Sequence, residues 1–295
     1  MEKIMKYLED EFHKKLYITE NGCNLINRVQ EMITRERIVI KNERNIMVPG
    51  CQLQLVDDET INAFSTKIDG EYCIFVNKGI IEEQKNYLER LDWSFISETK
   101  QRTEYINKMI EYGFYFIVFH EYAHILCGHI DAGLSNSADK KAQECEADMF
   151  SMDYLVKYIE TFHSMENLTI ELEKMFLSVY FLFENMQKQN YLECYNDRLI
   201  QNYYDEDRIL QRDHPLNAQR VLYLYEMLNI VVVTDKIQML PLKDNIIDKL
   251  RIIKRLTNKD ISTRKGEYLT VHESVQKIKE SIKEIRNKIP RLNSK

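Results

Sequence analysis

His120-Glu121-Tyr122-Ala123-His124 follows an apolar run, 114–119, near the middle of the 295-residue chain. Helical apolar spacing from about 104 to 130 predicts one long helix, buried at the centre of a domain. Positions i and i+4 of a helix lie on one face, so the two histidines can bind one zinc ion. Glu121 lies off that face, where its carboxylate can accept a proton from water at the metal. The stretch therefore predicts a metal-dependent hydrolytic site.

A catalytic zinc normally has three protein ligands and one open position, so a third ligand is expected downstream. Glu144 and Asp148 stand four residues apart on a second predicted helix, 141–162, after a turn signal at 131–133. Both side chains should therefore face one way. We expect Glu144 to bind the metal and Asp148 to accept a hydrogen bond from the outer nitrogen of a ligand histidine.

Four other side chains are alternatives for the third ligand. Glu146 is a rival on the same helix. His129 follows His124 at i+5, which fails the metzincin pattern of a histidine at i+6, and on a continuing helix it would point well away from the site. Cys127 and Cys145 flank the site and are soft ligands in principle, although helix packing is their expected role. We treat all four as alternatives to the downstream glutamate.

Short alternating segments between residues 36 and 80 predict a small antiparallel sheet of three or four strands. The candidate strands are 52–56, 61–64 and 72–76, with the turn signal Asp69-Gly70 before the last of them. Residues 1–35 and most of the chain after 80, including 166–186, have helical spacing, while the β-branched run 230–233 fits a late strand or a buried helix end. The sequence therefore predicts an α+β fold with a mostly helical remainder.

Composition excludes several classes of function. The net charge of −6 gives no global basic field for nucleic acid. The longest apolar run, 114–119, is far shorter than the roughly 20 residues of a membrane span. The charged N-terminus lacks a signal core, and the six cysteines form no CxxC pair, so we expect reduced thiols and a soluble, cytoplasmic protein.

The HExxH and ExxxD motifs together resemble those of the gluzincin metallopeptidases, and more closely those of the Ste24-type CAAX prenyl endopeptidases and HtpX heat-shock proteases. Those families read HExGHxxxxH and then ExxADxxA, and this chain has His120, His124, His129 and the segment 144–151. It departs from them in Ala123, which replaces the usual glycine, and in lacking their transmembrane helices. A soluble chain of this length is also similar to the Lit-type phage-exclusion peptidases, which cleave a host translation elongation factor during infection.

The resemblance spans roughly residues 50–225 and implies roles for residues outside the metal site. Asn62 and Ala63, before Phe64, are similar to an edge-strand motif that pairs with the substrate backbone in those families. His214, in an HPxxxxR-like element that ends at Arg220, would donate a hydrogen bond to the oxyanion. Arg220 would brace the site.

These observations predict a zinc endopeptidase that cleaves a cytoplasmic protein or peptide, with Zn²⁺ held by His120, His124 and Glu144 and with Glu121 as the general base. A zincin-like domain over 1–235 would carry the site, with a helical extension over 236–295 packed on it.

Three other functions are compatible with the sequence. A regulatory zincin-fold protein could dock on a partner through the amphipathic tail 271–295, which has seven basic residues and three glutamates. A repressor-cleaving peptidase of a mobile element also carries HExxH and a downstream glutamate. A helical interaction protein could contain the motif by coincidence.

Overall fold

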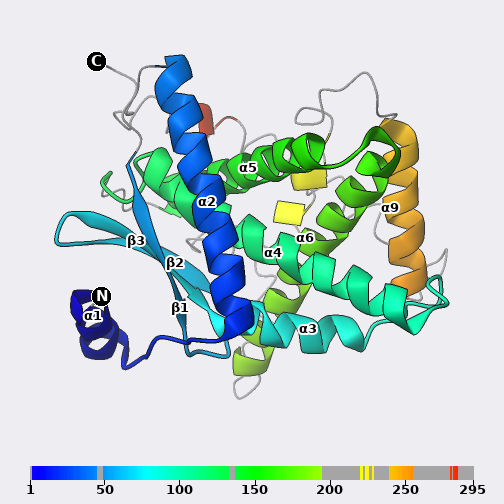
Figure 1. The fold of residues 1–295 in the computed structure, drawn as a ribbon, viewed down its shortest axis with the longest axis horizontal. Coiled ribbons are helices and arrows are strands. Elements are labelled where there is room, and N and C mark those ends of the chain that lie inside the picture. The colour runs from blue at the N-terminus through cyan, green and yellow to red at the C-terminus, as the bar shows by residue number, and fades with distance from the viewer. Residues whose placement is uncertain are drawn as a thin grey trace.

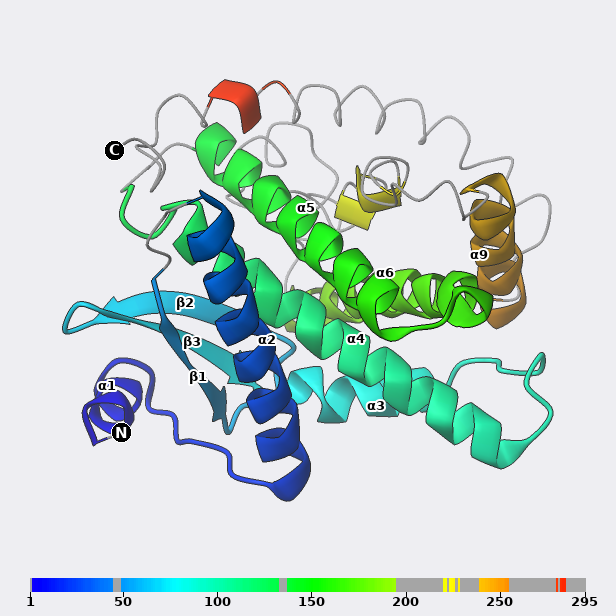
Figure 2. The same ribbon diagram turned by 45° about the horizontal axis from the view of Figure 1, so that its top comes forward.

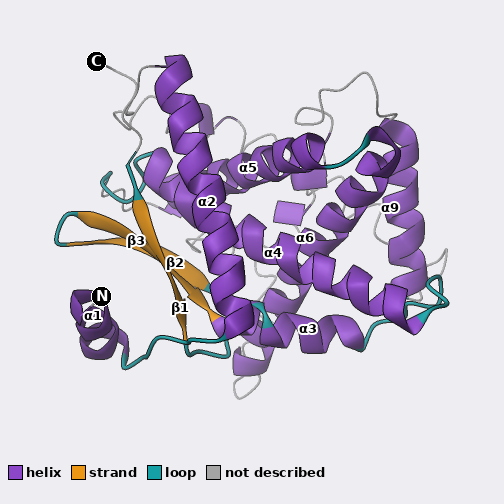
Figure 3. Cartoon of the chain, in the orientation of Figure 1, coloured by secondary structure: helices purple, strands orange, loops and turns teal. Residues whose placement is uncertain are grey.

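Helices form most of the structure, and a three-stranded sheet lies at one end (Figures 1 and 3). The computed structural model describes residues 2–44, 49–132, 137–194 and 239–254, with the isolated positions 220, 221, 223–225, 228, 280 and 282–284. The elements before the HExxH motif are α1 (Glu2–Phe12), α2 (Glu20–Arg44), β1 (Cys51–Val56), β2 (Ala63–Ile68), β3 (Glu71–Asn77), a 3₁₀ turn (Lys78–Ile80) and α3 (Glu82–Glu89). The later elements are α4 (Thr99–Leu126), α5 (Ser137–Phe162), α6 (Met165–Cys194) and α9 (Met239–Ile253).

The sheet is mixed, which corrects the prediction of an antiparallel sheet over 36–80. Its strand order is β1-β3-β2, with β1 parallel to β3 and β2 antiparallel to β3. The α+β class is confirmed, but α2 continues to Arg44 and the sheet begins only at Cys51. The physical reason for the order lies in β3, which is apolar on both faces and is therefore the strand that burial places in the centre.

Helices cover both faces of the sheet. Cys73 and Phe75 of β3 pack with Leu8 of α1 on the outer face. Ile74 and Val76 point to the other face and join the main core with α2 and α4. Because side chains alternate along a strand, the continuous apolar run of β3 supplies both layers. Figure 2 shows α1 and α2 on opposite sides of the sheet.

The long helix α4 forms the centre of the molecule. It packs against α2, α3, α5, α6 and two strands of the sheet. Its apolar run is buried all round, and Gly113 allows α6 to approach so closely that an added Cβ would lie 3.1 Å from the Ser178 hydroxyl. A helix that is apolar on every side belongs in a core, as predicted for this segment. Among the described residues, no helix combines the length and apolar character that a membrane span requires.

The helix α9 lies against α6 and contributes Leu242 and Ile246 to the same core. The division of the chain at residue 235 stays a prediction. The run 230–233 lies outside the described residues, and so does the tail 271–295 apart from 280 and 282–284. Of these, Ile282 is helical and buried.

Candidate active site

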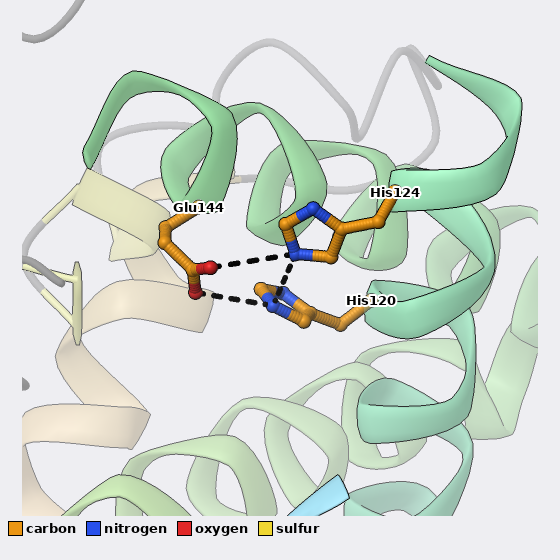
Figure 4. A group of neighbouring side chains, drawn as sticks. All are labelled: His120, His124 and Glu144. Carbon is orange, nitrogen blue, oxygen red and sulfur yellow. Dashed lines mark hydrogen bonds and ion pairs between the residues drawn. The ribbon is translucent and has the colours of Figure 1, made fainter. Parts of the chain in front are cut away.

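Two antiparallel helices bring three of the predicted site residues together (Figure 4). His120 and His124 lie one turn apart on α4, and Glu144 comes from α5, which packs beside α4. His120 Nε2 lies 3.1 Å from His124 Nε2. The Glu144 carboxylate lies 3.3 Å from His120 Nε2 and 3.5 Å from His124 Nε2. The three ligand atoms thus face one point between the helices.

This donor set fits a zinc ion. Zinc binds imidazole nitrogen and carboxylate oxygen at about 2.0–2.2 Å in a tetrahedron, which separates neighbouring ligand atoms by about 3.3 Å. The three observed separations, 3.1, 3.3 and 3.5 Å, bracket that value. The side chain of His120 is 5% exposed, whereas those of His124 and Glu144 are each 13% exposed, so the latter two keep more surface accessible to solvent.

Asp148 lies one turn after Glu144 on α5 and contacts the opposite edge of the His120 ring. Its Oδ1 lies 2.9 Å from His120 Nδ1, and its side chain has no exposed surface. Arg220 binds the same carboxylate with two hydrogen bonds, Nε to Oδ2 at 2.7 Å and Nη2 to Oδ1 at 2.6 Å. Burial alone would raise the pKa of Asp148, but the charge and hydrogen bonds of Arg220 and His120 outweigh it and lower that pKa.

Glu121 is buried, and its carboxylate contacts β2. The Ser65 hydroxyl donates a hydrogen bond of 2.7 Å to its Oε2 atom. Burial raises the pKa of Glu121, and the positive charge of His120 and the hydrogen bond from Ser65 oppose this only in part. A carboxylate with a raised pKa is a better proton acceptor, as a general base requires. Ser65 was missed from the sequence, although it lies two residues after Ala63 and so on the same side of the strand.

In the metal-free chain the pKa values of the two histidines of the motif are shifted in opposite directions. Burial disfavours the charged form of His120, but hydrogen bonds and charges of Asp148 and Glu144 outweigh burial and raise its pKa to about 10. Burial lowers the pKa of His124 to about 3. His120 is therefore the ring that carries an extra proton near neutral pH, and His124 is neutral.

The position of His129 contradicts the expectation that it points away from the site. The helix α4 ends at Leu126, and Gly128 has a positive φ of 74°. The N–H of His129 then bonds to His124 O at 2.9 Å, and that of Gly128 to Ile125 O at 3.1 Å. These two bonds define a Schellman motif, which turns the chain back at the end of a helix. As a result, His129 Nδ1 lies 2.9 Å from His124 Nδ1.

Glu146, the predicted rival of Glu144, faces His129 instead. Its Oε2 lies 3.1 Å from His129 Nε2. Cys127, His129 and Glu146 form a second group whose ligand atoms lie within 4.8 Å of one another. Cys145 is buried, which raises the pKa of its thiol well above the ordinary value, and a thiol held protonated is a poor metal ligand.

The remaining predicted residues lie apart from the group formed by His120, His124 and Glu144, or lie outside the described residues. Ala63 is the first residue of β2, which is an edge strand, and its N–H bonds to the Asn62 side chain at 2.9 Å. The Asn62 carbonyl accepts a hydrogen bond of 3.0 Å from the Asn77 N–H. His214 and Pro215 lie outside the described residues.

A comparison with protein families found a match for this chain. The profile of the family described as Peptidase U49 matches residues 80–231, just over half of the chain. The chain belongs to the Peptidase U49 family. The matched segment contains α4, α5 and Arg220, and thus His120, Glu121, His124, Glu144 and Asp148, while the sheet with Ser65 precedes it. Searches of curated proteins and of solved structures found no match to the chain.

Proposed function

We propose that this peptidase is a zinc-dependent endopeptidase of the gluzincin type. The observation that carries the proposal is the convergence of His120 Nε2, His124 Nε2 and the Glu144 carboxylate from two helices, at separations of 3.1–3.5 Å. Membership of a peptidase family supplies the reaction, and the donor set favours zinc among the common metals. A bound zinc ion would supply a Lewis acid that polarises a carbonyl and makes water acidic enough to lose a proton near neutral pH.

The chain's own groups would move the proton. The Glu121 carboxylate would take a proton from the water that attacks the peptide carbonyl, and would return it to the nitrogen of the leaving amine. The C–N bond breaks as that nitrogen is protonated, so the products are a carboxylic acid and an amine. Ser65 would hold Glu121 in place through its Oε2 atom. Asp148 would fix the His120 ring by accepting a hydrogen bond from Nδ1.

The edge strand β2 would hold the substrate. Within the described part of the chain it pairs only with β3, and Ser65 within it contacts Glu121. An extended peptide could therefore add to the sheet beside the proposed base, with the segment starting at Asn62 and Ala63 as its partner. By resemblance to the Ste24-type and Lit-type peptidases, the core would be zincin-like, His214 would stabilise the oxyanion and the substrate would be a cytoplasmic protein, with phage exclusion as the biological setting.

The test measures zinc content and hydrolysis together. Wild-type chain purified with zinc should contain about one zinc ion, and Glu144→Ala should lose most of it. Glu104→Ala, an exposed glutamate on α4, is the matched control and should retain zinc. Glu121→Gln should retain zinc and lose cleavage of denatured casein. A wild-type chain without zinc, or a Glu121→Gln chain as active as wild type, would contradict the proposal.

The same measurements separate a peptidase from a binding protein of the same fold. A regulatory protein that uses the metal only for structure would bind zinc, and Glu121→Gln would not alter its function. Loss of hydrolysis with retained zinc in Glu121→Gln is therefore the result that favours catalysis.

A further inference from the structure

A buried chain of contacts leads from His124 away from the proposed zinc position. His124 Nε2 faces His120 and Glu144, while Nδ1, on the other edge of the ring, lies 2.9 Å from His129 Nδ1. His129 Nε2 in turn lies 3.1 Å from Glu146 Oε2. The side chains of His129 and Glu146 are 2% and 4% exposed. Their contacts are therefore made with little competition from solvent.

The proton positions in this chain follow from hydrogen-bond chemistry. A histidine that binds zinc does so as a neutral ring, so binding through Nε2 requires the single proton of His124 to be on Nδ1. The atom opposite, His129 Nδ1, must then accept that hydrogen bond and cannot carry a proton itself. The proton of His129 is therefore on Nε2, where Glu146, an acceptor when ionised, receives it.

We propose that His129 and Glu146 are positioning residues that hold His124 in the tautomer with its lone pair on Nε2. This inference rests on the proposed function, because it assigns a role relative to zinc at His120, His124 and Glu144. Outer partners of metal-binding histidines fix ring orientation and tautomer, and their removal typically lowers metal affinity about 10–100-fold. Here the partner of His124 is a second imidazole, whose own tautomer a carboxylate fixes.

The same proton count argues against a second metal ion at Cys127, His129 and Glu146. An ion bound to His129 Nε2 would require the His129 proton on Nδ1. If His124 also bound zinc through Nε2, both Nδ1 atoms would carry hydrogens, and these would collide across the 2.9 Å contact. The two groups therefore cannot both hold a metal ion through these atoms. With zinc at His120, His124 and Glu144, the residues His129 and Glu146 serve as outer hydrogen-bond partners of His124.

The test compares zinc affinity in variants that remove or keep the acceptor for His124. His129→Leu removes it, whereas His129→Asn can place an amide oxygen close to the position of Nδ1. We expect zinc to bind about 10–100-fold more weakly to His129→Leu and within a few-fold of wild type to His129→Asn. Competition with a chelator of known affinity measures both values, and thermal unfolding of the zinc-free chains checks that each variant folds.

Glu146→Gln tests whether Glu146 acts through His129. The amide can donate to His129 Nε2 as well as accept from it, so the tautomer is no longer fixed. We expect weaker zinc binding, by up to about tenfold, when His129 is present, and no further change when Glu146→Gln is combined with His129→Asn. Nitrogen NMR of the zinc-loaded wild type should show the His129 proton on Nε2 and the His124 proton on Nδ1.

Several outcomes would overturn the inference while leaving the proposed function intact. In each of them the wild type binds zinc. The first two concern zinc affinity: an equal loss of affinity in His129→Leu and His129→Asn, or an effect of Glu146→Gln on affinity that remains when His129→Asn is also present. The other two are a His129 ring protonated on Nδ1 and a second bound zinc ion that Cys127→Ser removes. If His129→Leu fails to fold, the other two variants and the NMR spectrum still decide. A wild type that binds no zinc would overturn both the proposed function and this inference.

Discussion

Arg220 and Asp148 form a bidentate ion pair in the protein interior. The guanidinium binds both carboxylate oxygens, at 2.7 and 2.6 Å, and the Asp148 side chain has no exposed surface. The charge of Asp148 raises the pKa of Arg220, although burial opposes this, so both groups stay charged. Because Asp148 also contacts His120, the pair links a late part of the sequence to the helix that carries HExxH.

Loss of Arg220 should destabilise the fold strongly. Arg220→Ala leaves the Asp148 carboxylate buried with one positive partner fewer, and breaking a buried pair in this way costs about 3–5 kcal/mol. Arg220→Lys should recover only part of the loss, because an ammonium cannot bind both oxygens in the same geometry. Urea unfolding of the zinc-free chains measures both effects. Lys3→Ala, which removes an exposed ion pair to Asp69, is the control and should leave the midpoint unchanged.

Zinc affinity should rise with pH. The pKa of His120 is raised to about 10, so zinc must displace a proton from this ring at neutral pH. His124, with its pKa lowered to about 3, adds no proton of this kind. We expect affinity to increase about tenfold per pH unit between about pH 6.5 and 8.5, with about one proton released. Calorimetry in buffers of different protonation enthalpy counts that proton, and a flat affinity over this range would contradict the assignment.

The stability of the zinc-free chain should change with pH in the opposite direction, falling as the pH rises. A folded-state pKa above the unfolded value of 6.5 stabilises the fold fully below pH 6.5. That contribution of His120 should be lost as the pH rises through about 10. Zinc should therefore protect the chain from unfolding more at pH 8.5 than at pH 6.5, which parallel thermal scans can measure.

The local parts of the fold could be predicted, because helical periodicity is a property of neighbouring residues. The helices α4, α5 and α6 begin and end within a few residues of their predicted bounds, apart from the longer C-terminal end of α6. The strand partners could not be predicted, because an apolar run such as β3 suits a parallel or an antiparallel neighbour equally well. The predicted antiparallel sheet was therefore wrong in the pairing of β1 with β3.

The candidate site shows the same limit. The spacing of His120, His124 and Glu144 predicts that they can meet, and the structure brings them together. Ser65 reaches Glu121 only through the packing of β2 on α4, which no sequence spacing encodes. His129 lies beside His124 because Gly128 turns the chain after α4 ends, whereas the prediction that it points away holds only for a helix that continues.

Ser65→Ala should shift the pH dependence of hydrolysis. A hydrogen bond to a carboxylate favours its charged form, so losing the Ser65 hydroxyl should raise the pKa of Glu121 further. The acidic limb of the kcat/KM profile for casein cleavage should then move to higher pH, because the base must be ionised to act. Thr66→Ala is the control, since Thr66 points to the other side of β2. Equal acidic limbs in wild type and Ser65→Ala would show that the hydroxyl does not influence the base.

Gly128→Ala should weaken zinc binding as well as the fold. Gly128 has a φ of 74°, and a side chain in this region costs about 1–2 kcal/mol. Relief of that strain would move His129 relative to His124, so we expect a zinc affinity at least about tenfold lower. Gly70→Ala is a matched control: Gly70 has a φ of 87°, its added Cβ would meet nothing within 4 Å, and it lies in the β2–β3 turn. The Gly70→Ala variant should be destabilised about as much as Gly128→Ala but should keep the zinc affinity of the wild type. Equal zinc affinities in the two variants would mean that the turn at Gly128 does not position the metal site.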